Sequence, residues 1–400
     1  MQTFKTSLCL ALFLLLAACG STPDAPPTTP APTERTVPTL PPPPTWMEAT
    51  TPLTLDNIAQ ARELGRLDPP GTLSTVFRHD FSPDSGRLAG LNNELLLAWD
   101  LITGRLVFSI PRQNAVQAYY SSDKTELYTI NDQGLTLIYD AEAGTVKNSF
   151  QGHESYASLS AYYDDADLLA LGGVNGEVKV WDTFARQSLV TLQTEGGDVT
   201  ALAFSPDGES LATATSGGKV QLWDWRNRQA LATFTQAEGA YAVRLAFSPD
   251  GSQLTAGEYA ALSVYSTTEQ TLLYDLATGE NGTTDVLMYS PDGRFLVNGG
   301  LIPNMLIWDT ATGDLVAQLP DVGGDRISAA FSPDGNMLVT ARLDGAVSLW
   351  NIADATQQSI PSGTFDIGAD RILYVDWSAD GFLLTFFDAT GPIYVWGIAP

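Results

Sequence analysis

Residues 199–224 read VTALAFSPDGESLATATSGGKVQLWD, a stretch that contains the main elements of the unit from which most of the chain is built. Strand-like apolar runs flank the sequence SPDG at residues 205–208. Proline fixes its own φ and glycine adopts a positive φ without steric cost, so SPDG predicts a tight turn between two antiparallel strands. A third run follows and ends in Trp-Asp at residues 223–224. The stretch therefore predicts three short strands joined by turns.

Related stretches recur along the chain with a period of about 42 residues. A tryptophan or tyrosine lies near the end of a strand-like run at positions 99, 139, 181, 223, 265, 308, 350 and 396. An aromatic residue followed by SPDG or a close variant begins at positions 81, 204, 247, 289, 331 and 377, with weaker versions at 120 and 162. A third motif, TGRLV, TGDLV or a relative, follows most of the Trp-Asp pairs and begins another strand. Each unit therefore predicts four short antiparallel strands.

The period, the Trp-Asp pair and the SPDG turn together resemble the WD40-type β-propeller, over about residues 53–400. The resemblance implies an all-β ring, in which each four-stranded blade is buried between two neighbours. Eight aromatic-ended runs predict eight blades, with seven blades and one stray repeat as the alternative. Only four residues follow Trp396, too few for a fourth strand in the last blade. Family members commonly close the ring with a strand from the other terminus, and residues 62–67 are the candidate, after a short predicted helix at 54–61.

The repeats depart from the strongest WD40 pattern in their polar residues. Strong repeats carry Gly-His before the first strand, an aspartate in the turn before the tryptophan strand, and a serine or threonine between them. In this chain only Gly152-His153 supplies the Gly-His, and its repeat has Leu171 where a hydroxyl would lie. Asp344 fits the turn position, but its repeat lacks the histidine. We therefore expect aromatic and β-branched packing to replace most of the polar network of the family.

The N-terminal residues have the pattern of a targeting signal. Lys5 precedes an apolar run from Leu8 to Ala18, which is too short to span a bilayer and is typical of a signal peptide. The run ends in LAACG at residues 16–20, which resembles a bacterial lipobox and implies that Cys19 is lipidated and becomes the new N-terminus. An ordinary cleaved signal with a chance cysteine is the alternative. Residues 20–52 are rich in proline and threonine and predict an extended stalk.

These features predict three segments: a signal peptide at 1–18, a lipidated cysteine and stalk at 19–52, and a propeller at 53–400. The expected location is outside the cytoplasm, on the bacterial cell membrane, with the lipid as the sole membrane contact. With 20 Lys and Arg against 46 Asp and Glu, the net charge of −26 excludes a typical nucleic-acid binder, which needs a cationic surface. Two histidines and two cysteines exclude His-rich or Cys-rich metal sites. We expect a monomer without a cofactor.

No P-loop, HExxH, GxSxG or EF-hand motif is present in the sequence. His79 and His153 are both expected to have structural roles. Charged residues nevertheless interrupt the predicted inner strands. Asp80 and Asp376 occupy equivalent positions in the first and eighth blades, and with Asp285 they are candidate ligands for a cation such as Ca²⁺. The favoured alternative is that an arginine neutralises them, for which the candidates are Arg78, Arg244 and Arg371.

The leading functional hypothesis is a non-catalytic, surface-tethered platform that binds other envelope or extracellular proteins. In this family the residues that begin each inner strand commonly form a docking ring. The matching positions are Tyr156, Asp198, Tyr241, Asp325, Arg326, Asp370 and Arg371. One alternative is a hydrolase or lyase whose channel metal is held by Asp80, Asp285 and Asp376. Another is a glycan or small-molecule sensor in which Trp225, beside Arg226 and Arg228, stacks on a sugar, although Trp225 is equally suited to packing under the blade edge.

Overall fold

The computed structural model describes residues 49, 51–70, 76, 78–154, 159–237, 239–257, 261–278, 286–300, 305–319, 327–352 and 371–398. All of them belong to the unit that spans Pro43–Pro400. They form eight antiparallel sheets, which are the eight blades of an all-β propeller. The eight-bladed ring predicted from the repeats is confirmed, and the seven-bladed alternative is wrong. Within the described part of the chain, no helix has the length and hydrophobicity that a bilayer crossing needs.

The blades follow one another along the chain, and each starts at the centre of the ring and runs outward. The strands of the first four blades are β2 (Arg78–Phe81), β3 (Arg87–Leu91), β4 (Leu95–Asp100) and β5 (Arg105–Pro111); β6 (Ala115–Tyr120), β7 (Glu126–Asn131), β8 (Leu135–Asp140) and β9 (Val146–Gln151); β10 (Leu159–Tyr163), β11 (Leu168–Gly172), β12 (Glu177–Asp182) and β13 (Gln187–Gln193); β14 (Val199–Phe204), β15 (Ser210–Thr215), β16 (Lys219–Asp224) and β17 (Gln229–Thr235).

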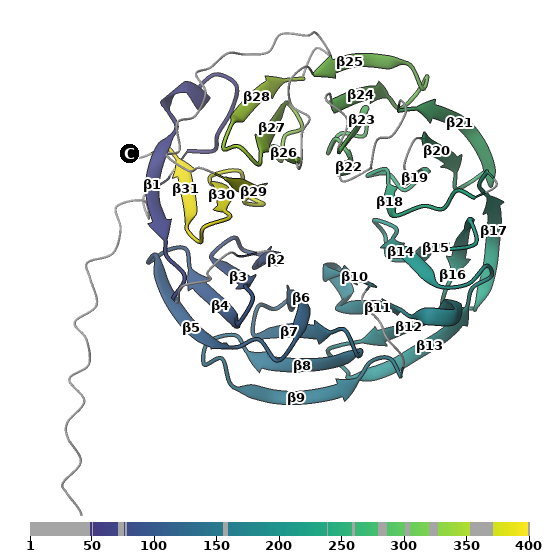
Figure 1. Ribbon diagram of the computed structural model, residues 1–400, viewed down its shortest axis with the longest axis horizontal. Helices are drawn as coiled ribbons and strands as arrows, with labels where there is room; N and C mark the ends of the chain where they lie inside the picture. The colour runs from purple at the N-terminus through teal and green to yellow at the C-terminus, as the bar shows by residue number, and fades with distance from the viewer. Residues whose placement is uncertain are drawn as a thin grey trace, which may run out of the picture. The chain divides into compact units, whose positions relative to one another are not determined.

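The remaining blades repeat this order. Their strands are β18 (Arg244–Phe247), β19 (Gln253–Gly257), β20 (Ala261–Ser266) and β21 (Thr271–Ala277); β22 (Val286–Tyr289), β23 (Phe295–Gly299), β24 (Met305–Asp309) and β25 (Leu315–Leu319); β26 (Ile327–Phe331), β27 (Met337–Arg342) and β28 (Val347–Asn351); β29 (Ile372–Trp377), β30 (Leu384–Asp388), β31 (Ile393–Gly397) and β1 (Arg62–Leu67). Strands β2, β6, β10, β14, β18, β22, β26 and β29 surround the centre (Figure 1).

The ring is closed by strand β1, which comes from the N-terminal side of the chain and forms the outer strand of the eighth blade. It pairs antiparallel with β31, with Arg62 opposite Gly397 and Leu67 opposite Ile393. The predicted closing strand is therefore confirmed. The helix expected before it is a single 3-10 turn, Ile58–Gln60, because the preceding residues form a turn in which the Thr54 N–H donates to Asn57 Oδ1 at 2.8 Å. Two further 3-10 turns are Asp164–Ala166 and Val174–Gly176.

The SPDG sequence forms the turn between the first and second strands of a blade. In blade 4 the Gly208 N–H donates to the Ser205 carbonyl at 2.8 Å, and Gly208 has a φ of +66°. The Asp207 Oδ1 accepts hydrogen bonds from the Ser205 hydroxyl at 2.6 Å and from the Glu209 N–H at 2.9 Å. These hydrogen bonds favour the carboxylate and lower the pKa of Asp207. The serine, aspartate and glycine of the motif therefore each stabilise the turn.

The aromatic residue of each repeat lies on the third strand and fills the space between blades. Trp99 and Tyr139 are each 1% exposed. The expectation that the polar network would be largely replaced by packing is only partly right. The indole N–H of Trp223 donates to Thr213 Oγ1 at 3.1 Å, and that of Trp350 donates to Thr340 Oγ1 at 2.9 Å. In both blades the threonine lies ten residues before the tryptophan, a spacing that is visible in the sequence.

Candidate functional site

The predicted docking ring lies where the inner strands begin. Asp198 directly precedes β14, Arg371 directly precedes β29, and Tyr241 lies three residues before β18. Asp198 and Arg371 are exposed, whereas Tyr241 is half-buried. The SPDG turns follow the same strands, so the ring and these turns lie at opposite ends of the inner strands. The other four ring candidates lie outside the described residues: Tyr156, Asp325, Arg326 and Asp370.

Hydrogen bonds from neighbouring loops hold Asp198 in place. Its Oδ1 accepts a hydrogen bond from the Asn175 N–H at 2.8 Å, and its own N–H donates to Ser216 Oγ at 3.1 Å. The Ser216 N–H in turn donates to the Asp198 carbonyl at 2.8 Å. These contacts link the ends of blades 3 and 4 at this loop. These hydrogen bonds therefore hold the exposed residue Asp198 in a fixed position, which a docking residue needs.

Asp376 is partnered by a residue that the sequence reasoning did not connect with it. His79 Nε2 lies 3.1 Å from Asp376 Oδ2, and the two residues come from the inner strands of the first and eighth blades. The imidazole stacks on Phe387, with 3.9 Å between ring centroids and 22° between planes. His79 thus joins the two blades that close the ring. The favoured prediction of an arginine partner for Asp376 missed this histidine, because the two residues are 297 positions apart.

Asp80 lies on the inner strand β2 and is half-buried. Its Oδ2 accepts a hydrogen bond from the Tyr120 N–H at 2.8 Å, which joins the first blade to the second. Burial raises the pKa of Asp80 to about 7, against the effect of that hydrogen bond, and the charges of Asp164 and Asp376 raise it further. The carboxyl is therefore partly protonated near neutral pH.

The proposed channel metal finds little support in this geometry. Asp376 is engaged by His79, Asp80 is held by a backbone N–H, and Asp285 lies outside the described residues. Within the described ranges, no group of three or more His, Cys, Asp or Glu side chains is arranged to hold a metal ion. The hypothesis of a metal-dependent hydrolase or lyase therefore has no site among these residues.

Trp225 is a packing residue. Its side chain is 2% exposed, and its indole N–H donates to the Gly208 carbonyl at 3.0 Å. The Arg226 guanidinium lies over the indole, 4.4 Å from the ring centroid, and Arg226 also donates to the Gly208 carbonyl at 3.2 Å. The indole face therefore contacts protein and is not open to a sugar. Of the two interpretations of Trp225, packing under the blade edge is the correct one.

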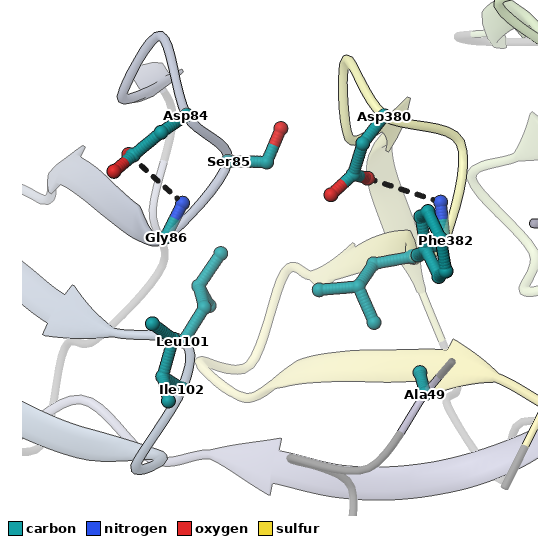
Figure 2. A pocket seen from close by; sticks show the side chains of 9 residues that line it. Ala49, Asp84, Ser85, Gly86, Leu101, Ile102, Asp380 and Phe382 are labelled. Atoms are coloured by element: carbon teal, nitrogen blue, oxygen red, sulfur yellow. Dashed lines mark hydrogen bonds between the residues drawn. The ribbon is translucent and has the colours of Figure 1, made fainter. Parts of the chain in front are cut away.

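Sequence reasoning missed a pocket between the turns of the first and eighth blades (Figure 2). Three of its lining residues, Asp84, Ser85 and Asp380, belong to the repeated turn motif. The signal that could have found it is a deviation in that motif. The first blade has SPDS at residues 82–85 where blades 4 to 7 have SPDG, and the eighth blade has SADG at residues 378–381.

The family comparison agrees with this architecture. A model of the family described as nucleolar protein 10-like, N-terminal domain, matches residues 103–302, which is half of the 400-residue chain. The chain belongs to this family of β-propellers. A second model, WD domain, G-beta repeat, matches residues 321–351. The resemblance to WD40-type propellers inferred from the repeats is thereby confirmed.

Curated relatives match parts of the ring. Periodic tryptophan protein 2 of Arabidopsis thaliana is 26% identical over 269 residues, 67% of this chain and 30% of the relative. Mitotic checkpoint protein BUB3.3 of the same plant is 27% identical over 131 residues, 32% of this chain and 41% of the relative. Apoptotic protease-activating factor 1 of Rattus norvegicus is 29% identical over 133 residues, 30% of this chain and 11% of the relative. The matched region spans less than half the length of each of these relatives, so the similarity establishes the propeller and not a partner.

Proposed function

We propose that this propeller is a non-catalytic platform for protein–protein interaction, held at the outer surface of a bacterial cell membrane. The observation that carries the proposal is the common position of Asp198, Tyr241 and Arg371 at the starts of inner strands. A rigid ring that presents polar and aromatic side chains from several blades at one end is suited to a protein partner, because aromatic and charged anchors dominate such interfaces. The membership in a WD-repeat propeller family supports the same class of function.

The membrane attachment in this proposal rests on the N-terminal sequence. Cys19 follows an apolar run and two alanines, and carries the lipid. Residues 20–52 act as the stalk that spaces the propeller from the membrane. The partners are other envelope or extracellular proteins, bound by a monomeric propeller. Its net charge of −26 favours partners with a basic surface.

Crosslinking at the cell surface, followed by affinity capture and mass spectrometry, tests the docking ring. The variant combines Asp198→Ala, Tyr241→Ala and Arg371→Ala. The matched control combines Glu269→Ala and Asp314→Ala, two exposed residues in turns at the opposite end of the blades. We expect an envelope protein to be captured by the wild type and the control and lost from the ring variant, with equal melting temperatures for all three. Capture that is unchanged in the ring variant would overturn the proposed function.

The tether has its own test. Replacing Cys19 with serine removes the thiol that receives the lipid. We expect metabolic labelling with palmitate to disappear and the protein to move from the membrane fraction to the soluble extracytoplasmic fraction. A Cys9→Ser variant, altered inside the predicted signal peptide, serves as the control and is expected to remain labelled. Membrane retention of the Cys19→Ser variant would contradict the anchor.

A further inference from the structure

Consecutive turns of the ring fit together in one repeated way. The glycine of one SPDG turn lies beside the proline of the turn before it. A Cβ atom placed on the glycine would lie 3.7 Å from the proline Cδ for Gly251 and Pro206, and 3.6 Å from it for Gly293 and Pro249. The later pairs, Gly335 with Pro291 and Gly381 with Pro333, repeat the contact at 3.4 and 3.6 Å. From blade 4 to blade 8, a small residue thus packs on a proline at each junction.

The junction between blades 8 and 1 lacks both partners of this contact. The eighth blade has Ala379 in place of the proline, and the first blade has Ser85 in place of the glycine. Ser85 keeps the turn geometry, because its N–H donates to the Ser82 carbonyl at 2.8 Å and its φ is +56°. A positive φ is uncommon for a residue with a Cβ. This junction therefore lacks both the glycine–proline contact and the glycine that a positive φ favours.

A pocket of about 290 Å³ occupies this junction (Figure 2). Ser85 and Asp380 extend into the space between the two turns, whereas the Asp84 carboxylate is turned towards the Gly86 N–H. The wall below them is apolar. It is formed by Ala49, Leu101, Ile102, Phe382 and Leu383. Of these, Ile102 is 60% exposed, a large apolar side chain that the fold leaves open to solvent.

The Ser85 hydroxyl and the Asp380 carboxylate at the pocket can each form a further polar contact. Ser85 is 6% exposed, and its hydroxyl has no hydrogen-bond partner, which is costly for a buried polar group. Asp380 Oδ1 accepts from the Ser378 hydroxyl at 2.6 Å and from the Phe382 N–H at 3.0 Å. No cation among the described residues forms an ion pair with Asp380. The neighbouring Asp84, by contrast, is neutralised by Lys124, which holds the pKa of Asp84 at about 2.

We propose that this pocket binds an arginine or lysine side chain from a basic segment of a partner protein. The aliphatic part of that side chain packs on Ile102 and Phe382, and its charged end is held by the Asp380 carboxylate and the Ser85 hydroxyl. The strongly negative charge of the chain attracts such a segment. The inference rests on the proposed role as an interaction platform and adds a second surface, at the opposite end of the inner strands from the docking ring.

A second pocket between turns supplies the internal control. It lies between blades 5 and 6 and is lined by residues that include Pro249, Asp250, Asp292 and Gly293. Asp250 corresponds to Asp380, but both of its carboxylate oxygens already accept hydrogen bonds, Oδ1 from the Ser248 hydroxyl at 2.6 Å and Oδ2 from the Ser252 hydroxyl at 2.9 Å. The Gly-on-Pro contact is intact there, and large apolar side chains are lacking among its described lining residues. We therefore expect this pocket to leave basic side chains unbound.

The test uses fluorescein-labelled peptides Gly-Leu-X-Leu-Gly, in which X is arginine, lysine, glutamine or glutamate, with the full-length chain at physiological ionic strength. We expect the arginine and lysine peptides to bind at concentrations below about 1 mM and the other two not to bind. Asp380→Asn keeps an acceptor for Ser378 and Phe382 but removes the charge, and is expected to weaken binding about tenfold. Ser85→Gly restores the usual turn residue and is expected to weaken binding about threefold without loss of melting temperature. Asp250→Asn, the equivalent change in the control pocket, is expected to leave binding unchanged.

Three results would overturn the inference. They are no binding of the basic peptides to the wild type, equal binding to wild type and Asp380→Asn, or equal weakening by Asp380→Asn and Asp250→Asn, which would indicate attraction to the acidic surface as a whole. The docking-ring variant Asp198→Ala, Tyr241→Ala and Arg371→Ala is expected to bind the peptides normally. The peptide-binding and crosslinking experiments therefore distinguish a wrong assignment of the pocket from a wrong assignment of the docking ring.

Discussion

The junction between blades 8 and 1 and the junction between blades 5 and 6 have the same architecture but different contents. Between blades 5 and 6, Gly293 lies against Pro249, and both carboxylate oxygens of Asp250 accept hydrogen bonds from serine hydroxyls. Between blades 8 and 1, Ser85 and Ala379 stand at the corresponding positions, and Asp380, the equivalent of Asp250, accepts hydrogen bonds from described residues at Oδ1 alone. The comparison shows that the sequence of each turn can vary separately while the architecture of the junction stays the same. At the place where the two ends of the repeat array meet, both turns depart from the SPDG sequence.

The two junctions also differ in the blades that they join. The chain runs continuously from β21 to β22 and from β1 to β2, but the eighth blade is itself assembled from two segments far apart in the sequence, because β1 pairs with β31. One apolar cluster contains Leu64 and Leu67 of β1, Phe387 of the eighth blade, and Leu88 and Trp99 of the first. The stability of the closed ring therefore depends on packing between residues that are far apart in the sequence.

Phe387→Ala is the largest expected perturbation of the closing junction. Phe387 is 0% exposed and also stacks on His79. We expect it to lower the free energy of unfolding by about 3–5 kcal/mol, measured by urea denaturation. Hydrogen exchange of β1 amides should accelerate more than that of β17 amides. The matched change Leu254→Ala, buried between blades 4 and 5, should not show this bias. Equal acceleration in β1 and β17 for Phe387→Ala would contradict a distinct closing junction.

Asp80 lies on the inner strand of the first blade, and Asp80→Asn is expected to change how the free energy of unfolding depends on pH. The folded protein raises the pKa of Asp80 from 3.8 to about 7, so the folded state binds this proton more tightly than the unfolded state does. The resulting stability is fully present below about pH 4 and is lost as the pH rises towards 7. Asparagine cannot ionise and can still accept the Tyr120 N–H.

We therefore expect Asp80→Asn to be more stable than the wild type by about 2–4 kcal/mol at pH 8 and nearly equal to it at pH 3.5. Urea denaturation at several pH values measures this difference. A constant difference across that range would show that Asp80 does not titrate as the structure indicates. The exposed Asp84, with its pKa held low by Lys124, provides a comparison of opposite sign: Asp84→Asn should lose stability above about pH 4.

Thr213→Val tests how much the hydrogen bond from the indole to the threonine ten residues earlier stabilises a blade. The change leaves the indole N–H of the buried Trp223 without its acceptor. We expect a loss of about 1–2 kcal/mol in the free energy of unfolding, and near-complete recovery in Thr213→Ser. In the eighth blade Phe386 stands ten residues before Trp396, so its stability relies on packing at this place. A Thr213→Val protein as stable as the wild type would show that this hydrogen bond does not stabilise the blade.

Ser85→Gly should have the smallest effect, in the stabilising direction. It places glycine at a φ of +56° and removes a buried hydroxyl without a partner. We expect a gain of about 0.5–1 kcal/mol, because relief of the strain exceeds the added entropy of the unfolded chain. The same change makes the closing junction resemble the others. A loss of stability would mean that the Ser85 hydroxyl has a structural role.

The sequence was most informative where structure is local. SPDG turns, Trp-Asp pairs and the run at residues 62–67 predict the blades and the closing strand, because each signal lies within a few neighbouring residues. The sequence could not predict contacts between distant strands, such as His79 with Asp376. The spacing of Thr213 and Trp223 and the departure of Ser85 from SPDG were both visible, but their meaning needed the packing between blades. The docking ring and Cys19 stay predictions.

Site-specific photocrosslinking in living cells tests the central claim most directly. A photoreactive phenylalanine analogue is placed at position 198 or 371 in the docking ring, or at position 314 in a turn at the opposite end of a blade. We expect a covalent adduct with an envelope protein from positions 198 and 371 and none from position 314. An adduct from position 314 alone, or no adduct from any of the three at normal surface expression, would contradict the proposed interaction platform.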